Sequence, residues 1–129
     1  MKLEDASVLI IDDSVHIRAL FTMMMRKAGV TKFYQAIDGE DGLEKFKQYA
    51  PSIVFLDNML PKMSGVEVLK QIKMINPKAV VVMISAVSDI ETVREAKAAG
   101  ANYYLVKPYS PEKVVDIMYK LLNIERNSP

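Results

Sequence analysis

Acidic, hydroxyl and basic side chains follow four of the short apolar runs in the sequence. Asp12 and Asp13 come directly after the first run, and Asp57 comes directly after the third. Ser85 follows the fourth run and Lys107 follows the fifth. Three carboxylates in one place repel one another, so they need either a cation or a retained proton. Because this set offers oxygen ligands and no Cys or His, a hard cation such as Mg²⁺ suits it best.

The charges of this set indicate that an anion binds beside the metal. The three aspartates and Lys107 sum to about −2, and one Mg²⁺ would bring the site to about zero. Lys107 and Ser85 could then donate hydrogen bonds to the anion. A phosphoryl group fits this description. A carboxylate can also serve as the nucleophile in phosphoryl transfer, where it forms an aspartyl phosphate.

The short apolar runs predict the strands of a parallel sheet. They are mostly β-branched or aromatic, too short for helices, and nearly continuous rather than alternating, which favours strands covered on both faces. The second run is the weakest, so we expect it nearer a sheet edge. Ligands of open α/β sheets bind beyond the carboxyl ends of the strands, where the residues that follow the runs should meet. The predicted strands are 8–11, 32–36, 53–56, 79–84 and 103–106.

The longer segments between the runs predict amphipathic helices. The first helix closes at Gly29, and its predicted core stripe consists of Ile17, Leu20, Met24 and Ala28. The run Met23-Met24-Met25 is read as the edge of the core, with a docking surface as the alternative, because methionine adapts to varied partners.

Caps mark the starts of the later helices. Ser64-Gly65-Val66-Glu67 and Ser88-Asp89-Ile90-Glu91 have the pattern of a capping box, and Ser110-Pro111 places a cap before a proline. Strands and helices together make five β/α units in a row. They predict an α/β domain with a five-stranded parallel sheet and helices on both faces.

Length and composition exclude several function classes. The chain has 129 residues, the size of one domain, and 50% of them are hydrophobic. It has no cysteine, which excludes disulfides, thiol catalysis and Cys-based zinc sites. A net charge of +1 does not indicate electrostatic binding of nucleic acid. No apolar run approaches the ~18 residues of a membrane span. The acidic N-terminus lacks the apolar segment of a signal peptide. We therefore expect a soluble cytoplasmic protein that binds neither nucleic acid nor membrane.

The chain resembles the receiver domain of two-component response regulators, specifically the single-domain members of the CheY type. The resemblance covers about residues 7–122 and implies a doubly wound (βα)5 flavodoxin-like fold with strand order 2-1-3-4-5. Each matching motif is weak by itself, but the five together, in order and each at a predicted strand end, are specific. They are Asp12-Asp13, Asp57, Leu60-Pro61-Lys62-Met63-Ser64-Gly65, Ser85-Ala86 and Lys107-Pro108.

The resemblance implies a metal-assisted phosphoryl acceptor. Asp57 would accept a phosphoryl group from a phosphohistidine on a partner. Asp13 and Asp12 would bind Mg²⁺, with Mn²⁺ as a substitute, and Asp57 and the backbone carbonyl of Met59 would complete the protein ligands. Met59 and Val87 occupy two positions near the acceptor that vary within the family, and both are apolar here. Since neither can orient a hydrolytic water, we expect slow self-dephosphorylation.

The same resemblance implies a conformational switch. Lys107 would contact the phosphoryl oxygens, and Ser85 would move to bond the group. Tyr104 would turn inward as Ser85 moves, and the bond before Pro108 would be cis. This local charge change would alter a protein-binding face on the fourth helix, fifth strand and fifth helix. We expect the face to include Ile90, Val93, Ala98, Tyr104, Val114 and Lys120.

A receiver of this kind is a signalling protein rather than a turnover enzyme. The expected partners are a histidine kinase or histidine phosphotransfer protein, and a downstream target, either a flagellar switch or another histidine of a phosphorelay. We expect one receiver domain over residues 1–129, with its core at about 7–122, no effector domain and a monomeric state. A fragment of a larger regulator, and a dimer after phosphorylation, stay open as alternatives.

Two other classes share parts of the pattern. A haloacid-dehalogenase-type phosphatase also forms an aspartyl phosphate, but it needs Asp-x-Asp after its first strand, where this chain has Asp12-Asp13-Ser14. A flavodoxin-like FMN protein needs a hydroxyl- and glycine-rich loop at that place, and here the loop is acidic.

The single histidine, His16, is expected to be an exposed helix residue.

Overall fold

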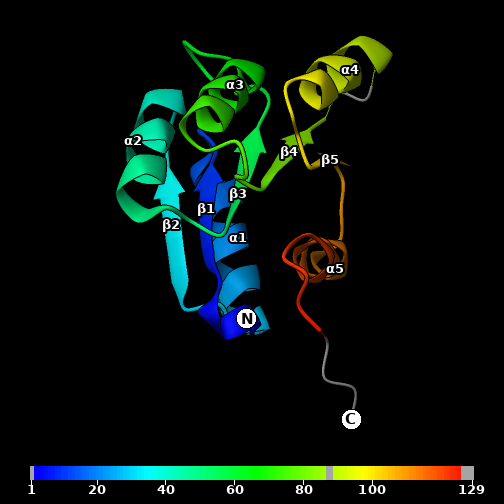
Figure 1. Ribbon diagram of the computed structural model, residues 1–129. Coiled ribbons are helices and arrows are strands. Elements are labelled where there is room, and N and C mark those ends of the chain that lie inside the picture. The colour runs from blue at the N-terminus through cyan, green and yellow to red at the C-terminus, as the bar shows by residue number, and fades with distance from the viewer. Residues whose placement is uncertain (1, 87–88, 126–129) are drawn as a thin grey trace.

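The computed structural model describes residues 2–86 and 89–125, and its five parallel strands form one sheet in the order β2-β1-β3-β4-β5 (Figure 1). This order confirms the prediction, including the edge position of β2. The strands are β1 (Ser7–Ile11), β2 (Lys32–Ala36), β3 (Ile53–Asp57), β4 (Val81–Ser85) and β5 (Tyr103–Val106). The helices are α1 (Val15–Ala28), α2 (Gly39–Tyr49), α3 (Gly65–Ile75), α4 (Ile90–Ala98) and α5 (Pro111–Leu121), after a short 3-10 helix at Leu3–Asp5.

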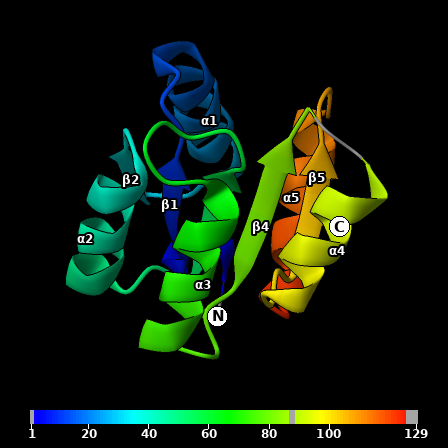
Figure 2. The ribbon, with the colours of Figure 1, turned by 90° about the horizontal axis from the view of Figure 1, so that it is seen from above.

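Helices cover both faces of the sheet, α1 and α5 on one side and α2, α3 and α4 on the other (Figure 2). Side chains of β1 alternate between the two cores, so Val8 and Ile10 face α1 and α5 while Leu9 and Ile11 face α2 and α3. Every residue of β3 and of β4 is buried. The predicted continuous apolar strands are thus explained by a sheet that is covered on both faces.

Side-chain caps begin the helices. The hydroxyls of Ser14, Ser64 and Ser110 accept the first free backbone N–H groups of α1, α3 and α5. The N-cap of α4 is Asp89, whose carboxylate accepts from Thr92 N–H. The predicted cap Ser88 is therefore wrong by one residue, and Ser88 itself lies outside the described residues. Either residue type caps well, so the sequence pattern could not separate them.

The core face of α1 differs from the predicted stripe. Phe21 and Met25 are fully buried, whereas Leu20 is 54% exposed and Met24 is only partly buried. Phe21 takes the central place because its ring packs 5.1 Å from that of Phe55. Apolar residues lie on both sides of the true stripe, so spacing alone could not identify its centre.

The structure also tests membrane insertion and element ends. Within 2–86 and 89–125, no helix combines the length and apolarity that crossing a membrane requires. β3 and β4 each extend one residue beyond the predicted end, so Asp57 and Ser85 are the last residues of their strands. Their backbones are consequently held by the sheet, Asp57 opposite Ile84 and Ser85 opposite Val106.

Candidate metal centre

The carboxyl ends of the parallel strands bring together the residues singled out from the sequence. Asp12 directly follows β1, and Asp57 ends the neighbouring strand β3. Ser85 ends β4, which neighbours β3, and Lys107 follows β5. The backbone N–H of Lys107 donates to the carbonyl of Ser85 at 2.9 Å, which continues the sheet contact beyond the strand ends.

Three carboxylates form the centre of the site. One oxygen from each of Asp12, Asp13 and Asp57 lies within 4.8 Å of the others. Asp12 is 1% exposed and Asp57 5% exposed, while Asp13 is open to solvent. Burial, and secondarily the charge of Asp12, raises the pKa of Asp57 to about 6. Burial also raises the pKa of Asp12. Two buried acids beside a third oppose ionisation unless a cation is present.

The hydrogen bonds of these carboxylates leave one oxygen unsatisfied. Asp12 Oδ1 accepts the Ser14 N–H at 2.8 Å, and Asp57 Oδ1 accepts the Met59 N–H at 3.3 Å. Asp12 Oδ2 is buried and has no hydrogen-bond partner among the described residues. A buried carboxylate oxygen without a partner is costly, and a metal ion would remove that cost. Oxygen donors of this kind fit Mg²⁺.

Arg18 supports the site, although the sequence reading missed it. Its guanidinium Nη1 donates to the backbone carbonyl of Asp12 at 2.6 Å. This bond links the first turn of α1 to the end of β1 and holds the backbone of Asp12 in position. The sequence does place a basic residue one helical turn after the N-cap Ser14, but solvent-exposed basic residues of helices occur at the same spacing, so this position alone did not indicate a role.

Gly65 is required by a close backbone approach at the start of α3. A Cβ at this position would lie 2.4 Å from the Asp57 carbonyl oxygen and 2.6 Å from Asn58 Cα. The Gly65 N–H donates to the Asn58 carbonyl at 3.0 Å, so the α3 N-terminus closes directly against the end of β3. The sequence placed Gly65 in a motif, but its steric reason becomes visible only in three dimensions.

An aromatic series connects the site to the α1–α5 side of the sheet. The ring of Phe21 contacts Phe55, two residues before Asp57, and meets Tyr109 edge-on at 6.1 Å. Burial, followed by the charges of Asp12 and Asp57, raises the pKa of Tyr109 to about 12. The phenol is therefore neutral at physiological pH.

The remaining residues of the expected site have the following positions. Ser85 is fully buried, and Tyr104 is half-buried against the core shared by α2, α3 and α4. Lys107 is half-buried, and the Lys107–Pro108 peptide bond is cis. Val87 lies outside the described residues.

The surface residues of the sequence analysis divide into exposed and buried. Met59 is 67% exposed at the rim of the site, and His16 is exposed, as expected. Ile90, Ala98 and Lys120 are exposed and Val93 is half-buried. Val114 was expected on the same protein-binding face, but it is fully buried between α5 and the sheet and cannot contribute to that face.

The chain belongs to the response regulator receiver domain family, whose sequence profile matches residues 8–119. It is a CheY-like receiver of two-component signalling, and members of this family are signalling proteins rather than classical turnover enzymes.

Individual relatives are similar over nearly their whole length. The chemotaxis protein CheY of Thermotoga maritima is 36% identical, over 88% of this chain and 95% of that protein. Sporulation initiation phosphotransferase F of Bacillus subtilis is 32% identical, over 93% of this chain and 96% of that protein. A chain of the CheX-CheY-BeF3-Mg²⁺ complex from Borrelia burgdorferi superposes with a TM-score of 0.85 at 33% identity, covering 90% of this chain and 88% of that chain.

Proposed function

We propose that this receiver accepts a phosphoryl group on Asp57. A carboxylate oxygen of Asp57 attacks the phosphorus of a phosphohistidine on a histidine kinase or phosphotransfer protein. The P–N bond breaks, and the imidazole leaves and takes up a proton. The observation that carries the proposal is the unsatisfied, buried Asp12 Oδ2 beside the buried carboxylate of Asp57, because this arrangement calls for a cation and then favours an anion next to it.

Asp12, Asp13, Asp57 and the backbone carbonyl of Met59 would hold Mg²⁺, or Mn²⁺ in its place. When bound, the ion neutralises the carboxylates and part of the charge on the incoming phosphoryl group. The Mg²⁺ named in the Borrelia complex supports this choice of metal. In the protein, Arg18 fixes the backbone of Asp12, and the Met59 N–H orients the carboxylate of Asp57.

Lys107 and Ser85 would recognise the transferred group. A phosphoryl group adds about two negative charges and three acceptor oxygens, which attract the Lys107 ammonium and the Ser85 hydroxyl. Movement of Ser85 at the end of β4 opens space that the half-buried ring of Tyr104 on β5 fills. Strands β4 and β5 are paired, with Met83 opposite Tyr104, so the rearrangement reaches the surface of β5 and α4.

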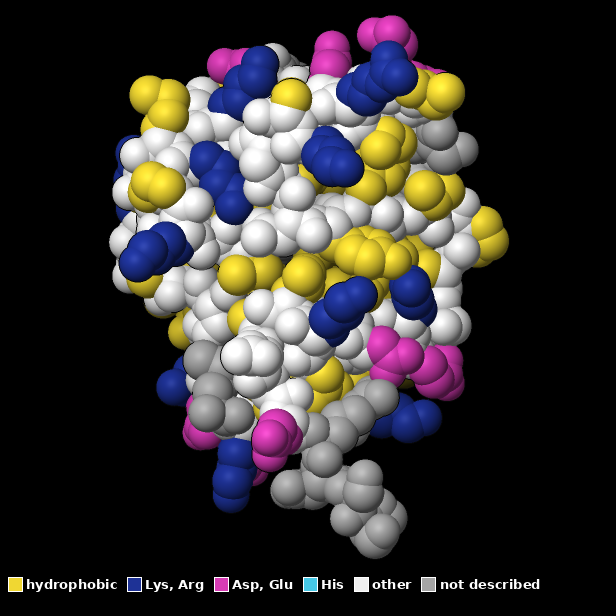
Figure 3. All heavy atoms as spheres, turned by 45° about the vertical axis from the view of Figure 1, so that its right-hand side comes forward, with side chains coloured by type: hydrophobic (Ala, Val, Ile, Leu, Met, Phe, Trp, Pro, Cys, Tyr) yellow, Lys and Arg dark blue, Asp and Glu magenta, His cyan; other side chains and the backbone are white. Residues whose placement is uncertain are grey.

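The face formed by α4, β5 and α5 is then the surface that contacts a downstream protein. On this side of the molecule, hydrophobic side chains gather with Lys and Arg around them (Figure 3). Ile90 is 66% exposed and Val106 37% exposed, and the Lys113 ammonium lies 5.3 Å from the Tyr103 ring centre. An apolar segment with acidic residues on a target protein would complement such a face.

The phosphoryl group on Asp57 should be lost slowly. Met59, two residues after the acceptor, has a thioether that cannot orient an attacking water. It is 67% exposed, and its side chain offers no polar N–H or O–H group that could hold a water near Asp57. Self-dephosphorylation is in this account a slow reset of the switch.

A second candidate function is that of a phosphorelay intermediate, which passes the group from Asp57 to another histidine. The similarity to sporulation initiation phosphotransferase F supports it. Transfer of label from the phosphorylated chain to a histidine phosphotransfer protein would distinguish this role from direct action on a target.

The proposal is tested by intact-mass spectrometry after incubation with Mg²⁺ and a small acyl phosphate. The wild type should gain one phosphoryl adduct, which Asp57→Asn and metal chelation both abolish. Asp41→Asn is a matched control, because Asp41 is an aspartate on α2 paired with Lys45, and it should phosphorylate like the wild type. An adduct that persists in Asp57→Asn would show that Asp57 is not the nucleophile.

A further inference from the structure

Methionine is the residue of this chain that oxidants attack most readily, because the sequence has nine methionines but neither cysteine nor tryptophan. Over residues 2–86 and 89–125, three methionine side chains are largely open to solvent: Met23 is 68% exposed, Met59 67% and Met74 82%. Three others are fully buried, namely Met25, Met83 and Met118. Since oxidation of a thioether requires access to the sulfur, we expect the first three to react before the buried ones.

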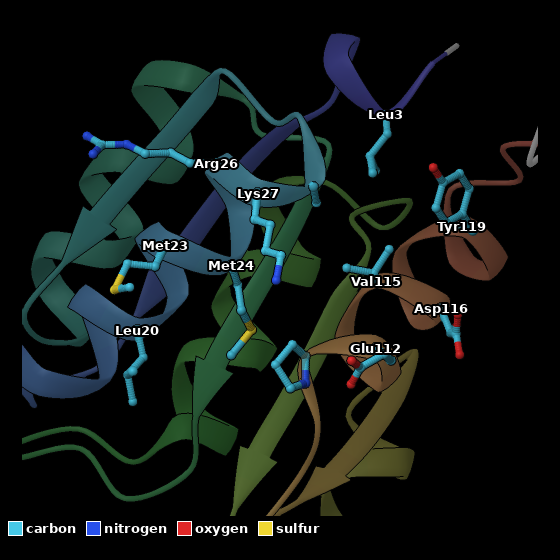
Figure 4. A pocket seen from close by; sticks show the side chains of 12 residues that line it. Leu3, Leu20, Met23, Met24, Arg26, Lys27, Glu112, Val115, Asp116 and Tyr119 are labelled. Carbon is cyan, nitrogen blue, oxygen red and sulfur yellow. The ribbon is translucent and has the colours of Figure 1, made fainter.

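The three exposed methionines lie on different parts of the molecule. Met23 is on α1 and lines a groove between α1 and α5 (Figure 4). Met74 is in the last turn of α3. Met59 follows the acceptor aspartate by two residues and is the one of the three that belongs to the site. The other two are therefore internal controls for any effect of oxidation at Met59.

The backbone of Met59 is held against the carboxylate of Asp57. Its N–H donates to Asp57 Oδ1 at 3.3 Å, so the Met59 Cα lies within about 5 Å of that oxygen. The exposed side chain thus starts beside the acceptor. The three clustered carboxylates of the site repel anionic oxidants but not a neutral one. A peroxide is therefore the class of oxidant that this position admits best.

We propose that Met59 is an oxidation site that sets how long a phosphoryl group stays on Asp57, an inference that rests on the function proposed above. A peroxide gives one oxygen atom to the Met59 sulfur. The S–O bond forms as the O–O bond breaks, and the rest of the peroxide leaves as water or an alcohol. The thioether is oxidised by two electrons and the peroxide is reduced by two.

The sulfoxide supplies a strong hydrogen-bond acceptor that the thioether lacks. Its oxygen is bonded to Sδ, as Oε1 of glutamine is bonded to Cδ, so the two side chains present an acceptor at the same distance along the chain. A water that donates one O–H to the sulfoxide keeps a lone pair free to attack the phosphorus. The bond from phosphorus to the Asp57 oxygen breaks, the carboxylate leaves, and both water protons remain on the released phosphate. Oxidation thereby converts a slow reset into a fast one.

The modification is reversible, as a regulatory site requires. A thiol-dependent methionine sulfoxide reductase returns the thioether, and two thiols become a disulfide as the oxygen leaves as water. The phosphoryl lifetime of the reduced chain should then return to its original value. Recovery distinguishes sulfoxide formation from irreversible damage.

The test measures the decay of the phosphoryl adduct before and after treatment with hydrogen peroxide. Exposure is limited so that the thermal midpoint is unchanged, and peptide mass spectrometry locates the added oxygen. The full chain is then phosphorylated with a small acyl phosphate and Mg²⁺, and the donor is removed. Oxidised wild type should lose the group roughly tenfold faster than untreated wild type, and the reductase should restore the original rate.

Three variants assign the effect to one sulfur. Met59→Leu should decay at the same rate before and after peroxide, although Met23 and Met74 are oxidised in it. The double variant Met23→Leu, Met74→Leu should still show the acceleration. Met59→Gln should decay fast without peroxide and gain nothing from it.

Three results would overturn the inference. They are an unchanged lifetime when Met59 is fully oxidised, an acceleration that persists in Met59→Leu, and oxidation of Met59 no faster than that of the buried methionines. Absence of any adduct on the untreated wild type is a different failure, because it removes the proposed phosphoryl acceptor itself and the inference with it.

Discussion

Asp12 and Asp57 hold buried carboxylate oxygens within 4.8 Å of each other at the ends of neighbouring strands β1 and β3. Both side chains are almost inaccessible to solvent, and this burial, followed by the nearby charge of Asp12, raises the pKa of Asp57 to about 6. Without a metal ion, ionisation of these carboxyl groups is therefore less favourable in the folded chain than in the unfolded chain. We therefore expect stability, pH and the proposed metal binding to be coupled through this pair.

The first prediction concerns pH. The pKa of Asp57 is about 6 when folded and about 3.9 when unfolded, so between these values the folded chain binds more protons. The contribution of Asp57 to the free energy of unfolding is therefore fully present below about pH 4 and is lost as the pH rises through 6, by up to about 3 kcal/mol. Urea unfolding in a chelator from pH 4 to 7.5 measures the decline.

Asp57→Asn supplies the control for this titration. The variant should lose most of the decline and should be more stable than the wild type at pH 7.5, because the amide needs no proton to be neutral. Parallel stability profiles for the two proteins would show that Asp57 is not the titrating group.

The second prediction concerns the metal. Mg²⁺ at 100 times its dissociation constant should raise the free energy of unfolding by about 2.7 kcal/mol. At a fixed Mg²⁺ concentration the gain should be larger at pH 7.5 than at pH 5, because binding requires deprotonated carboxylates and the dissociation constant is therefore lower at the higher pH. Thermal unfolding with and without Mg²⁺ measures it. Asp12→Asn should lose the gain, Glu44→Gln on the exposed side of α2 should keep it, and an equal gain in both variants would contradict the site.

The third prediction concerns the lifetime of the phosphoryl group. Met59→Gln places an amide that can orient water beside the acceptor, and we expect the group to be lost roughly tenfold faster, equivalent to ~1.4 kcal/mol in the barrier. Decay of the adduct after removal of the phosphate donor measures the rate. Met74→Gln is the matched control, since Met74 is also highly exposed but lies on α3. A lifetime of only seconds in the wild type would refute slow self-dephosphorylation.

The fourth prediction concerns Arg18. Arg18→Ala removes the 2.6 Å bond to the Asp12 carbonyl and should lower the free energy of unfolding by about 1.5 kcal/mol. It should also weaken Mg²⁺ binding about tenfold, because the carboxylate of Asp12 is no longer held in position. Isothermal titration calorimetry measures the affinity. Arg26→Ala, at an exposed position in the last turn of α1, should change neither quantity, and equal effects of both variants would exclude a specific role.

Much of the fold could be predicted from the sequence because burial on two faces leaves a simple pattern. The continuous apolar runs corresponded to strands, and the weakest run became the edge strand β2. The stripe of α1 was misplaced because Leu20 and Phe21 are both apolar, and only the fit of Phe21 against Phe55 decides which is buried. Val114 was assigned to a surface because the resemblance indicates α5 as part of a protein-binding face, but it does not indicate which side chains of α5 point into the core.

The centre of the site could be predicted because its residues lie at strand ends, where parallel topology brings them together. The supporting groups could not be predicted in the same way. Arg18 donates a hydrogen bond to a backbone carbonyl, and Gly65 allows two backbone segments to approach closely. Tyr109 meets the ring of Phe21 edge-on. These interactions depend on how α1, α3 and the loop before α5 approach the sheet, and no local pattern in the sequence records such approaches.

The most direct test of the account identifies the phosphorylated residue chemically. The chain is phosphorylated with a small acyl phosphate and Mg²⁺, reduced with borohydride, which converts an aspartyl phosphate to homoserine, and mapped by peptide mass spectrometry. The account predicts homoserine at position 57 and nowhere else, with none formed in a chelator. Homoserine at Asp12 or Asp13, or none at position 57 in a sample whose intact mass shows the adduct, would contradict it.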